Sequence, residues 1–281
     1  MRQTTAEASD NSHWRFAARS ADATDMLITV TNQKGGVGKT MLTVHAAVRA
    51  AERGANVFVL DADNQALCHE WLSEAAPELM CLASPDASRL REVVTQIRGH
   101  VDVAFADAPP GLGDGTLTLL SLSDLVILPL RPSYADLRAT VQTLEAIKSL
   151  SSEREANGGG PIDIWVVMNM YQSGDNHTKM VEKTLRQLGA RVAHGRIGMR
   201  TAFRNSNRDG FVVWNAEGRA LDRKAVDEMV GVLDEILPAH LFNDTESSST
   251  DTTSTDHEHQ DERRDEVRRP HAAGAADRAA A

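Results

Sequence analysis

Residues 32 to 40 combine glycine, lysine and threonine in an order that suits the binding of phosphate groups. The stretch runs Asn-Gln-Lys-Gly-Gly-Val-Gly-Lys-Thr. Glycines allow consecutive backbone N–H groups to point at a phosphate, the final lysine suits the β- and γ-phosphates, and the hydroxyl suits Mg²⁺. The residues able to supply these contacts are Gly35, Gly36, Gly38, Lys39 and Thr40. The pattern therefore predicts a phosphate-binding loop, or P-loop.

The loop departs from the ordinary G-x-x-x-x-G-K-[ST] pattern at its entrance. Gln33 stands where the first glycine is usual, and Lys34 adds a second lysine. An apolar run, 27–30, precedes the loop and a helical pattern follows it. Strand, loop and helix therefore come in the order that a P-loop requires, the alternative being a solvated lysine beside a chance glycine-rich turn.

Three carboxylates follow two further apolar runs. Asp61 and Asp63 come after Val57–Leu60, and Asp107 comes after Val101–Ala106 and precedes a proline turn. In an open α/β sheet the carboxyl ends of the strands form the edge where ligands bind. Mg²⁺ prefers carboxylate and phosphate oxygens and keeps several waters, so we expect Asp107 to hold its water shell. For Asp61 and Asp63, a helix N-cap and a solvated acid are the alternative.

Apolar runs alternate with helical patterns through the middle of the chain, as expected for βαβ units. The predicted strands are Leu27–Thr31, Val57–Leu60, Val101–Ala106, Leu125–Leu128 and Ile164–Met168. The predicted helices include Lys39–Arg53 and Ala135–Ser151, and Glu153–Pro161 is expected to be a surface linker. The sequence thus predicts an α/β fold with a mainly parallel sheet.

The second lysine, taken with these motifs, resembles the deviant Walker A ATPases of the ParA/MinD family. Asp63–Trp71 matches the D-P-Q-G-S-A-L-D-W stretch of small partition ATPases in length, with Asp63, Gln65 and Trp71 identical. The resemblance spans roughly Met26–Leu237 and is closest to small ParA-like proteins without an N-terminal DNA-reading domain. It implies a P-loop NTPase fold, a doubly wound sheet with helices on both faces.

The resemblance also implies an ATP- and Mg²⁺-dependent ATPase and gives roles to individual residues. Lys34 is expected to reach across an ATP-sandwich dimer, and Asp63 to position the attacking water. The expected catalytic residues are Lys34, Lys39 and Asp63. The expected Mg²⁺ site comprises Thr40, Asp61 and Asp107. The expected ATP-binding residues are Lys34, Gly35, Gly36, Val37, Gly38, Lys39, Thr40, Met41 and Asn169. Asn169 would contact the base, although a buried asparagine also suits the cap of a strand-end turn.

Three positions depart from the pattern that this family usually shows. Met41 stands in place of a second threonine that hydrogen-bonds the α-phosphate, and Asn64 stands in place of a proline. Gly198 replaces the proline of the family's base-packing segment, Ile197–Arg200. A lost hydrogen bond to a charged group costs roughly 1.5 to 3 kcal/mol. We therefore expect slow turnover with retained ATP binding.

Length and composition indicate one globular domain with polar ends. The chain has 281 residues, of which 41% are hydrophobic and 25% charged, and no apolar run approaches the roughly 20 residues of a membrane-spanning helix. We expect a flexible arm over 1–25, the ATPase domain over 26–240 and a disordered acidic, Ser/Thr-rich tail over 241–281. Cys68 and Cys81 form no metal-binding pattern, which argues against an iron–sulfur ATPase and suits a cytoplasmic protein.

The net charge of −10 conceals a basic stretch. Residues 179–208 contain eight lysines and arginines and a single acidic residue, Glu182. Within the stretch Arg200, Arg204 and Arg208 recur at every fourth position, so in a helix they would share one face. Because aromatic residues that could stack on bases are few, we expect these arginines to bind the backbone of duplex DNA without sequence preference. An ordinary solvated helix is the alternative.

The sequence therefore predicts an ATP-dependent homodimeric switch that binds nucleoid DNA and positions a plasmid, chromosome region or protein complex. A ParB-like or other cargo adaptor is expected to stimulate its slow hydrolysis. A MinD-like ATPase on a membrane surface is the alternative from another class. The last predicted helix, Lys224–Leu237, is acidic on its polar positions, and an anionic membrane would repel it. A switch that holds ATP and scarcely hydrolyses it is a further alternative.

Overall fold

The structure, a computed structural model, describes residues 25–83, 86–172 and 176–241. In this part of the chain seven parallel strands form one sheet in the order β3-β2-β4-β1-β5-β6-β7. The strands are β1 (Met26–Val30), β2 (Val57–Asp61), β3 (Met80–Ala83), β4 (Val103–Asp107), β5 (Leu125–Leu130), β6 (Asp163–Tyr171) and β7 (Arg191–Gly198). The prediction of an α/β P-loop fold with a parallel sheet is confirmed.

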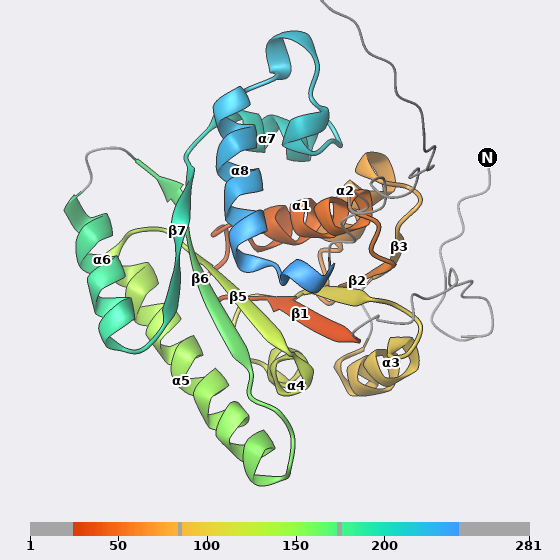
Figure 1. The fold of residues 1–281 in the computed structure, drawn as a ribbon, viewed down its shortest axis with the longest axis vertical. Coiled ribbons are helices and arrows are strands. Elements are labelled where there is room, and N and C mark those ends of the chain that lie inside the picture. The colour runs from red at the N-terminus through yellow and green to blue at the C-terminus, as the bar shows by residue number, and fades with distance from the viewer. Residues whose placement is uncertain (1–24, 84–85, 173–175, 242–281) are drawn as a thin grey trace, which may run out of the picture. The chain divides into compact units, whose positions relative to one another are not determined.

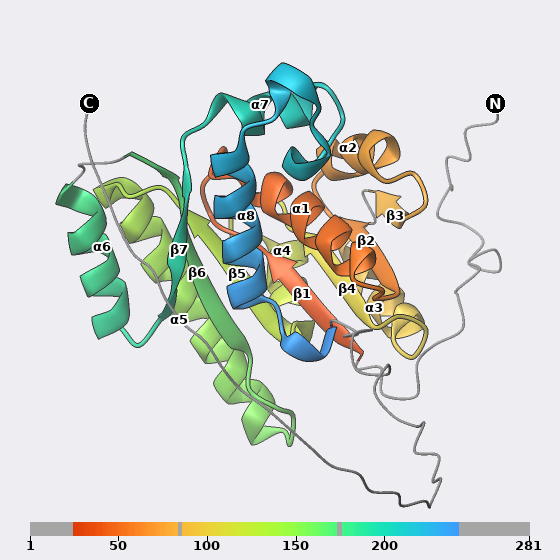
Figure 2. The ribbon, with the colours of Figure 1, turned by 45° about the horizontal axis from the view of Figure 1, so that its top comes forward.

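Helices cover both faces of this sheet (Figures 1 and 2). One layer contains α1 (Lys39–Glu52), α2 (Leu67–Ala75), α7 (Thr201–Arg208) and α8 (Arg223–Ile236). The opposite layer contains α3 (Leu90–Ile97), α4 (Asp114–Leu122), α5 (Tyr134–Ala156) and α6 (Asn176–Gln187). Short 3-10 turns η2 (Ala87–Arg89), η3 (Val213–Asn215), η4 (Gly218–Ala220) and η5 (Ala239–Leu241) complete the described elements. The predicted linker is shorter than expected because α5 continues to Ala156.

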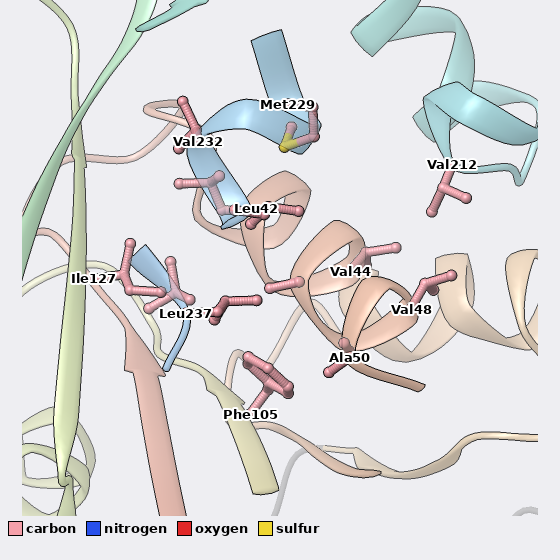
Figure 3. Packing of buried hydrophobic residues seen from close by; sticks show 14 of the residues in the cluster. Leu42, Val44, Val48, Ala50, Phe105, Ile127, Val212, Met229, Val232 and Leu237 are labelled. Carbon is pink, nitrogen blue, oxygen red and sulfur yellow. The ribbon is translucent and has the colours of Figure 1, made fainter. Parts of the chain in front are cut away.

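The strands are continuous apolar runs because both of their faces are covered. On one face Phe105 of β4 packs in the same cluster as α1 and α8, where Met229 and Val232 lie near Leu42 (Figure 3). On the other face Phe58 of β2 packs in a separate cluster that includes α3. The helix that follows the P-loop is therefore held against the sheet and beside α8, which fixes the position of the loop.

The sequence analysis missed both edge strands, β3 and β7. The first has only four residues. The second carries charged residues, a histidine and two glycines, which an edge strand tolerates because one of its sides is not paired. Most of the predicted arm and tail, 1–24 and 242–281, lies outside the described residues. Within the described residues, no helix has both the length and the apolar character needed to cross a bilayer.

Candidate active site

Three neighbouring strands bring the predicted phosphate- and metal-binding residues to one edge of the sheet. In the parallel register Val30 of β1 and Asp61 of β2 both lie beside Asp107 of β4. The glycine-rich loop leaves β1 just beyond Val30 and ends at the first turn of α1. The loop and the two carboxylates therefore meet at the carboxyl ends of the strands, where ligands bind in open α/β sheets.

Two glycines of the loop adopt a backbone conformation that other residues rarely take. Gly36 and Gly38 have φ angles of 70° and 95°. At Gly38 a side chain would also collide with Asn169, since an added Cβ would lie 2.1 Å from its Nδ2. Gly38 is the N-cap of α1 and offers no side-chain cap to the helix. The first N–H groups of α1 and the positive end of its dipole therefore suit an anion such as phosphate.

Thr40, in the first turn of α1, binds Asp107 directly. Its hydroxyl donates to Oδ2 of Asp107 at 2.6 Å, and the hydroxyl of Thr43, one turn later, lies 3.5 Å from Oδ1. Burial raises the pKa of Asp107 to about 7, because the bond from Thr40 and the charge of Lys39 offset only part of the cost of burial. The sequence analysis did not single out Thr43, although its spacing from Thr40 on one helix face was the available signal.

Lys39 and Asp61 are further charged groups with little access to water. The side chain of Lys39 is 8% exposed, and burial lowers its pKa despite the nearby charges of Asp107 and Asp63. Asp61 is buried, which raises its pKa, and it accepts the backbone N–H groups of Asp63 at 3.1 Å and His69 at 2.9 Å. Asp61 therefore contacts the start of α2, as in the helix-cap interpretation. This contact is compatible with the predicted place of Asp61 in the Mg²⁺ site.

The oxygen atoms at this edge fit a Mg²⁺ ion that is bound together with a nucleotide. The carboxylates of Asp61 and Asp107 and the hydroxyl of Thr40 are hard oxygen donors, and a divalent cation would stabilise the ionised carboxylates. In the part of the chain that the structure describes, no three His, Cys, Asp or Glu side chains converge as a metal site. Phosphate oxygens and water would therefore have to complete the coordination, as is usual for Mg²⁺.

Asp63 lies in a turn next to this edge. Its Oδ1 accepts the backbone N–H of Gln65 at 3.0 Å, which forms an Asx turn, and Ala66 then adopts a left-handed conformation with φ 52°. The turn leaves Asp63 about half-buried between β2 and α2. A local backbone contact therefore positions this carboxylate near the buried acid Asp61, and its role in positioning the attacking water stays a prediction.

Lys34 makes a contact that the sequence analysis did not identify. Its Nζ lies 2.7 Å from Oδ1 of Asp136, which belongs to the first turn of α5. The Nε of Arg131 lies 2.9 Å from the other carboxylate oxygen of Asp136. Asp136 is buried, and Ser133 caps the helix by accepting its backbone N–H. Burial alone would raise the pKa of Asp136, but the hydrogen bonds from Lys34, Arg131 and Ser133 outweigh it and lower the pKa. Lys34 is therefore bound within its own chain.

Asn169 at the end of β6 supports the P-loop. Its Nδ2 donates to the carbonyl of Val37 at 2.6 Å, and its Oδ1 accepts the N–H of Met170, which has a φ of 54°. The bond to Met170 is of the kind expected for an asparagine that caps a turn near the end of a strand, and the bond to Val37 adds a contact to the loop. The role of Asn169 in base binding stays a prediction. Beyond it lies an open hollow of about 520 Å³, lined by Tyr171, Gln172, His194, Arg196, Gly198, Met199, Arg200, Lys224 and Glu228.

The nucleotide-binding domain family described as CobQ/CobB/MinD/ParA matches residues 28–210 of the chain. The chain belongs to this family. The matched residues begin in β1 and end just after α7. They contain the P-loop and the four aspartates Asp61, Asp63, Asp107 and Asp136. The resemblance that the sequence suggested is confirmed at the level of the family.

Two relatives of this ParA-family domain are similar in sequence over different lengths. The Maintenance of carboxysome distribution protein A of Halothiobacillus neapolitanus is 29% identical over 217 residues, which cover 75% of this chain and 96% of that protein. The Chromosome partitioning protein ParA of Caulobacter vibrioides is 27% identical and covers 57% of this chain and 75% of that protein. The family therefore includes relatives named for positioning different cargoes.

Solved structures of ParA-family proteins share the fold of this chain at low identity. The apo McdA of Cyanthece superposes with a TM-score of 0.60 at 14% identity, and covers 76% of this chain and 99% of that one. A putative plasmid partition protein of Borrelia burgdorferi, bound to AMPPNP, superposes with a TM-score of 0.57 at 16% identity, covering 74% of this chain and 97% of that one. These likenesses support the fold described above.

Met41 of this ParA-family domain packs against the core, and its carbonyl accepts from Nδ1 of His45 at 2.8 Å. The other ring nitrogen, Nε2, accepts the N–H of Val213 in η3 at 3.2 Å. The ring contacts Trp71 and Trp214 edge-on and is fully buried, which lowers the pKa of His45 to about 4. The sequence analysis missed this neutral histidine, which joins the P-loop helix to the segment after α7.

The three arginines predicted to bind DNA do not form one helical stripe. Arg200 precedes α7 in extended conformation, and its Nε and Nη2 donate to the two carboxylate oxygens of Glu228, each at 2.7 Å. Arg208 binds the neighbouring Asp209 at 2.6 and 2.7 Å, and Arg204 donates to Thr201 at 3.4 Å. Two of the three guanidinium groups are therefore engaged in ion pairs within the chain.

Proposed function

We propose that this protein is an ATP-dependent dimerising switch that positions a cargo on nonspecific DNA and hydrolyses ATP slowly with Mg²⁺. The observation that carries the proposal is the convergence of Lys39, Thr40, Asp61 and Asp107 around the glycine loop at one sheet edge. Each of these groups is the type that binds phosphate oxygens or Mg²⁺, and burial strengthens their interaction with a charged ligand.

The chemistry proposed for this edge is hydrolysis of ATP to ADP and phosphate. Phosphoryl transfer depends mainly on positioning and on stabilising charge, and bound Mg²⁺ would neutralise charge on the phosphates. Lys39 and the N–H groups of the loop would bind the β- and γ-phosphates, while Thr40, Asp61 and Asp107 would hold the Mg²⁺ and its water. Asp63 would position the attacking water from its turn beside them. Asn169 would lie toward the base.

Lys34 is the proposed link between ATP binding and dimerisation. Its side chain is 37% exposed, and its partner Asp136 is nearly inaccessible to water. In the dimer the ammonium group would leave Asp136 for the nucleotide of the second subunit, where it would stabilise charge that develops during hydrolysis. ATP would therefore be required for the dimer, and the dimer for turnover.

The proposed partners are duplex DNA, a cargo adaptor and a second copy of the chain. DNA would bind within the basic stretch 179–208, which carries eight lysines and arginines and one acid. Similarity over 96% of the carboxysome-distribution relative supports a protein body as cargo, and similarity to chromosome-partitioning proteins supports a chromosome or plasmid region. A ParB-like or other adaptor would stimulate hydrolysis. The protein would work in the cytoplasm, associated with the nucleoid.

A membrane-surface role of the MinD kind is less well supported. The helix that would serve as an anchor, α8, has its apolar residues buried against α1 and β7, and these residues are Ala225, Met229, Val232, Leu233 and Ile236. Its polar positions include acids that an anionic surface would repel. Insertion would thus require α8 to leave the core, so we propose no membrane partner.

The test is ATP turnover combined with molecular mass in solution, measured with ADP, with ATP and with ATP plus random duplex DNA. We expect a monomer with ADP, a dimer with ATP and a low basal turnover. Asp63→Ala is expected to retain ATP and to trap the dimer, because only the water-positioning group is lost. Asp86→Ala, which removes an exposed aspartate from the N-cap of η2, is the control and should behave like the wild type. Failure to bind ATP at millimolar concentration would refute the proposal.

A further inference from the structure

The basic stretch 179–208 divides into two groups of side chains once the fold is known. From β7 to α7 most arginines face an acid. Arg196 binds Glu182 at 2.7 and 2.9 Å, and Arg191 lies 3.7 Å from Asp163. The pairs of Arg200 and Arg208 are described above. The positive charge of this part of the stretch is therefore largely neutralised by its own chain.

The other group lies on α6, and its positive charge is not neutralised by ion pairs within the described part of the chain. Lys179, Lys183 and Arg186 are exposed, and their spacings of four and three residues place them on one face of the helix. We call these three residues the α6 basic face. In the described part of the chain no acidic side chain forms an ion pair with any of them, and Arg186 donates only to the carbonyl of Val192 at 3.0 Å. Glu182, the acidic residue of α6 itself, is paired with Arg196.

The shape of the α6 basic face suits a row of phosphates. Seven residues of helix separate Lys179 from Arg186, which corresponds to about 10 Å. Duplex DNA offers one phosphate charge for roughly every 1.7 Å of its axis, so several phosphates lie within this length. The face carries no aromatic ring on which a splayed base would stack, and contacts from lysine and arginine alone read charge rather than sequence.

A lipid surface fits the α6 basic face less well than DNA does. A helix that lies in a membrane interface buries an apolar face among the acyl chains. The apolar side of α6, Val181 and Leu185, is buried in the core of this domain against α5 and β7. Met180, 47% exposed, is the large apolar side chain of the helix that remains at its surface. An interaction that depends on charge without insertion is therefore favoured.

We propose that Lys179, Lys183 and Arg186 form the surface that contacts the phosphate backbone of duplex DNA, in place of the arginines before and within α7. This inference rests on the DNA binding in the proposed function and names the site for it. Because helix α6 is held at the outer edge of the sheet beside β7 (Figure 2), its basic face is presented on a rigid element.

The test is fluorescence anisotropy of a random-sequence duplex with the full chain and a non-hydrolysable ATP analogue at several salt concentrations. Lys179→Gln with Lys183→Gln is expected to weaken binding at least 10-fold and to lower the slope of log K against log salt by about 2, since two phosphate contacts are lost. The matched control is Arg204→Gln with Arg208→Gln, which removes the same charge from α7 and should change affinity less than twofold. Thermal unfolding and ATP binding of both variants report that each is folded.

Three outcomes would overturn the inference. Wild-type affinity in the α6 double variant refutes it directly, and a loss confined to the α7 variant assigns the site to α7. In either case DNA binding, and with it the proposed function, stands. If the wild type binds no duplex in any nucleotide state, both fail together. Binding to vesicles of phosphatidylcholine and phosphatidylglycerol, in place of duplex, would instead support the membrane alternative.

Discussion

Charged side chains are treated differently at two places on the sheet. Where β1, β2 and β4 end, Asp107 and Lys39 are buried. Burial raises the pKa of Asp107 and lowers the pKa of Lys39, so for both groups it favours the neutral form. Along β7, by contrast, Arg200 and Glu228 are each about 20% exposed and are bound to one another at 2.7 Å. Burial alone would raise the pKa of Glu228, but the bonds from Arg200 and from the N–H of Gly198 outweigh it and lower the pKa.

We interpret this difference as a separation between charges that are suited to bind a ligand and charges that hold the fold. A charge that remains costly to bury in the protein alone gains most from an added ligand of opposite charge. A charge already paired within the chain gains little and instead fastens one element to another, here α8 to β7.

Lys39→Ala is expected to weaken ATP binding by roughly 10- to 150-fold, because a hydrogen bond to a charged group contributes roughly 1.5 to 3 kcal/mol. Isothermal titration calorimetry with Mg²⁺ and ATP measures this loss. Lys183→Ala, which removes a lysine far from this edge on α6, should bind ATP as the wild type does. Equal affinities in the wild type and the Lys39 variant would remove this edge as the phosphate site.

Lys34→Ala is expected to retain ATP within a few-fold but to lose dimerisation or turnover, because Lys39 and the loop remain. Sedimentation with ATP and steady-state phosphate release are the measurements. Asp136→Asn is the matched variant, since it weakens the contact to Lys34 within the chain and leaves the lysine in place. We expect Asp136→Asn to keep the dimer and to lower the free energy of unfolding by roughly 1 to 2 kcal/mol. A Lys34 variant with normal dimer and turnover would refute its role between subunits.

His45 makes the free energy of unfolding depend on pH, because burial within the protein alone keeps its imidazole neutral. Its pKa falls from 6.5 to about 4 in the folded protein. Between these values the unfolded chain binds a proton that the folded chain does not, so the free energy of unfolding falls as pH is lowered from 6.5 toward 4. The full effect is about 3 kcal/mol. Urea unfolding at pH 7.5, 6.0 and 5.0 measures it, and the same slope in His45→Gln would assign the effect to other groups.

Glu228→Gln is expected to have the smallest effect, a loss of roughly 0.5 to 1.5 kcal/mol in the free energy of unfolding. The glutamine keeps the acceptor for Gly198 but loses the ion pair with Arg200, and the pair is partly screened by solvent. Urea unfolding is again the measurement. Glu92→Gln, from an exposed pair with Arg89 at 3.9 Å, should leave stability unchanged. ATP binding that falls sharply in the Glu228 variant would contradict our division between ligand-binding and structural charges.

The sequence could select candidate site residues where chemistry and backbone requirements fall close together in the chain. The glycines, Lys39 and Thr40 lie within six residues, and a loop between a strand and a helix has few other uses for that combination. Asp107 was recognised because a buried strand that ends in an acid is a simple local pattern. The order of strands, loops and helices likewise follows from local periodicity, which explains why the fold class was predicted correctly.

The tertiary structure alone decided which charges pair with which. Lys34 and Asp136 are 102 positions apart in the chain, and Arg200 meets Glu228 only because α8 returns to lie beside β7. Spacing in the sequence placed Arg200, Arg204 and Arg208 on one face, whereas the backbone is extended at Arg200 and the helix begins after it. Pairing depends on distances between elements that packing sets, and no local pattern contains that information. The sequence by itself therefore determined the glycine loop and the acids that follow the strands, and the fold determined which basic residues form ion pairs within the chain.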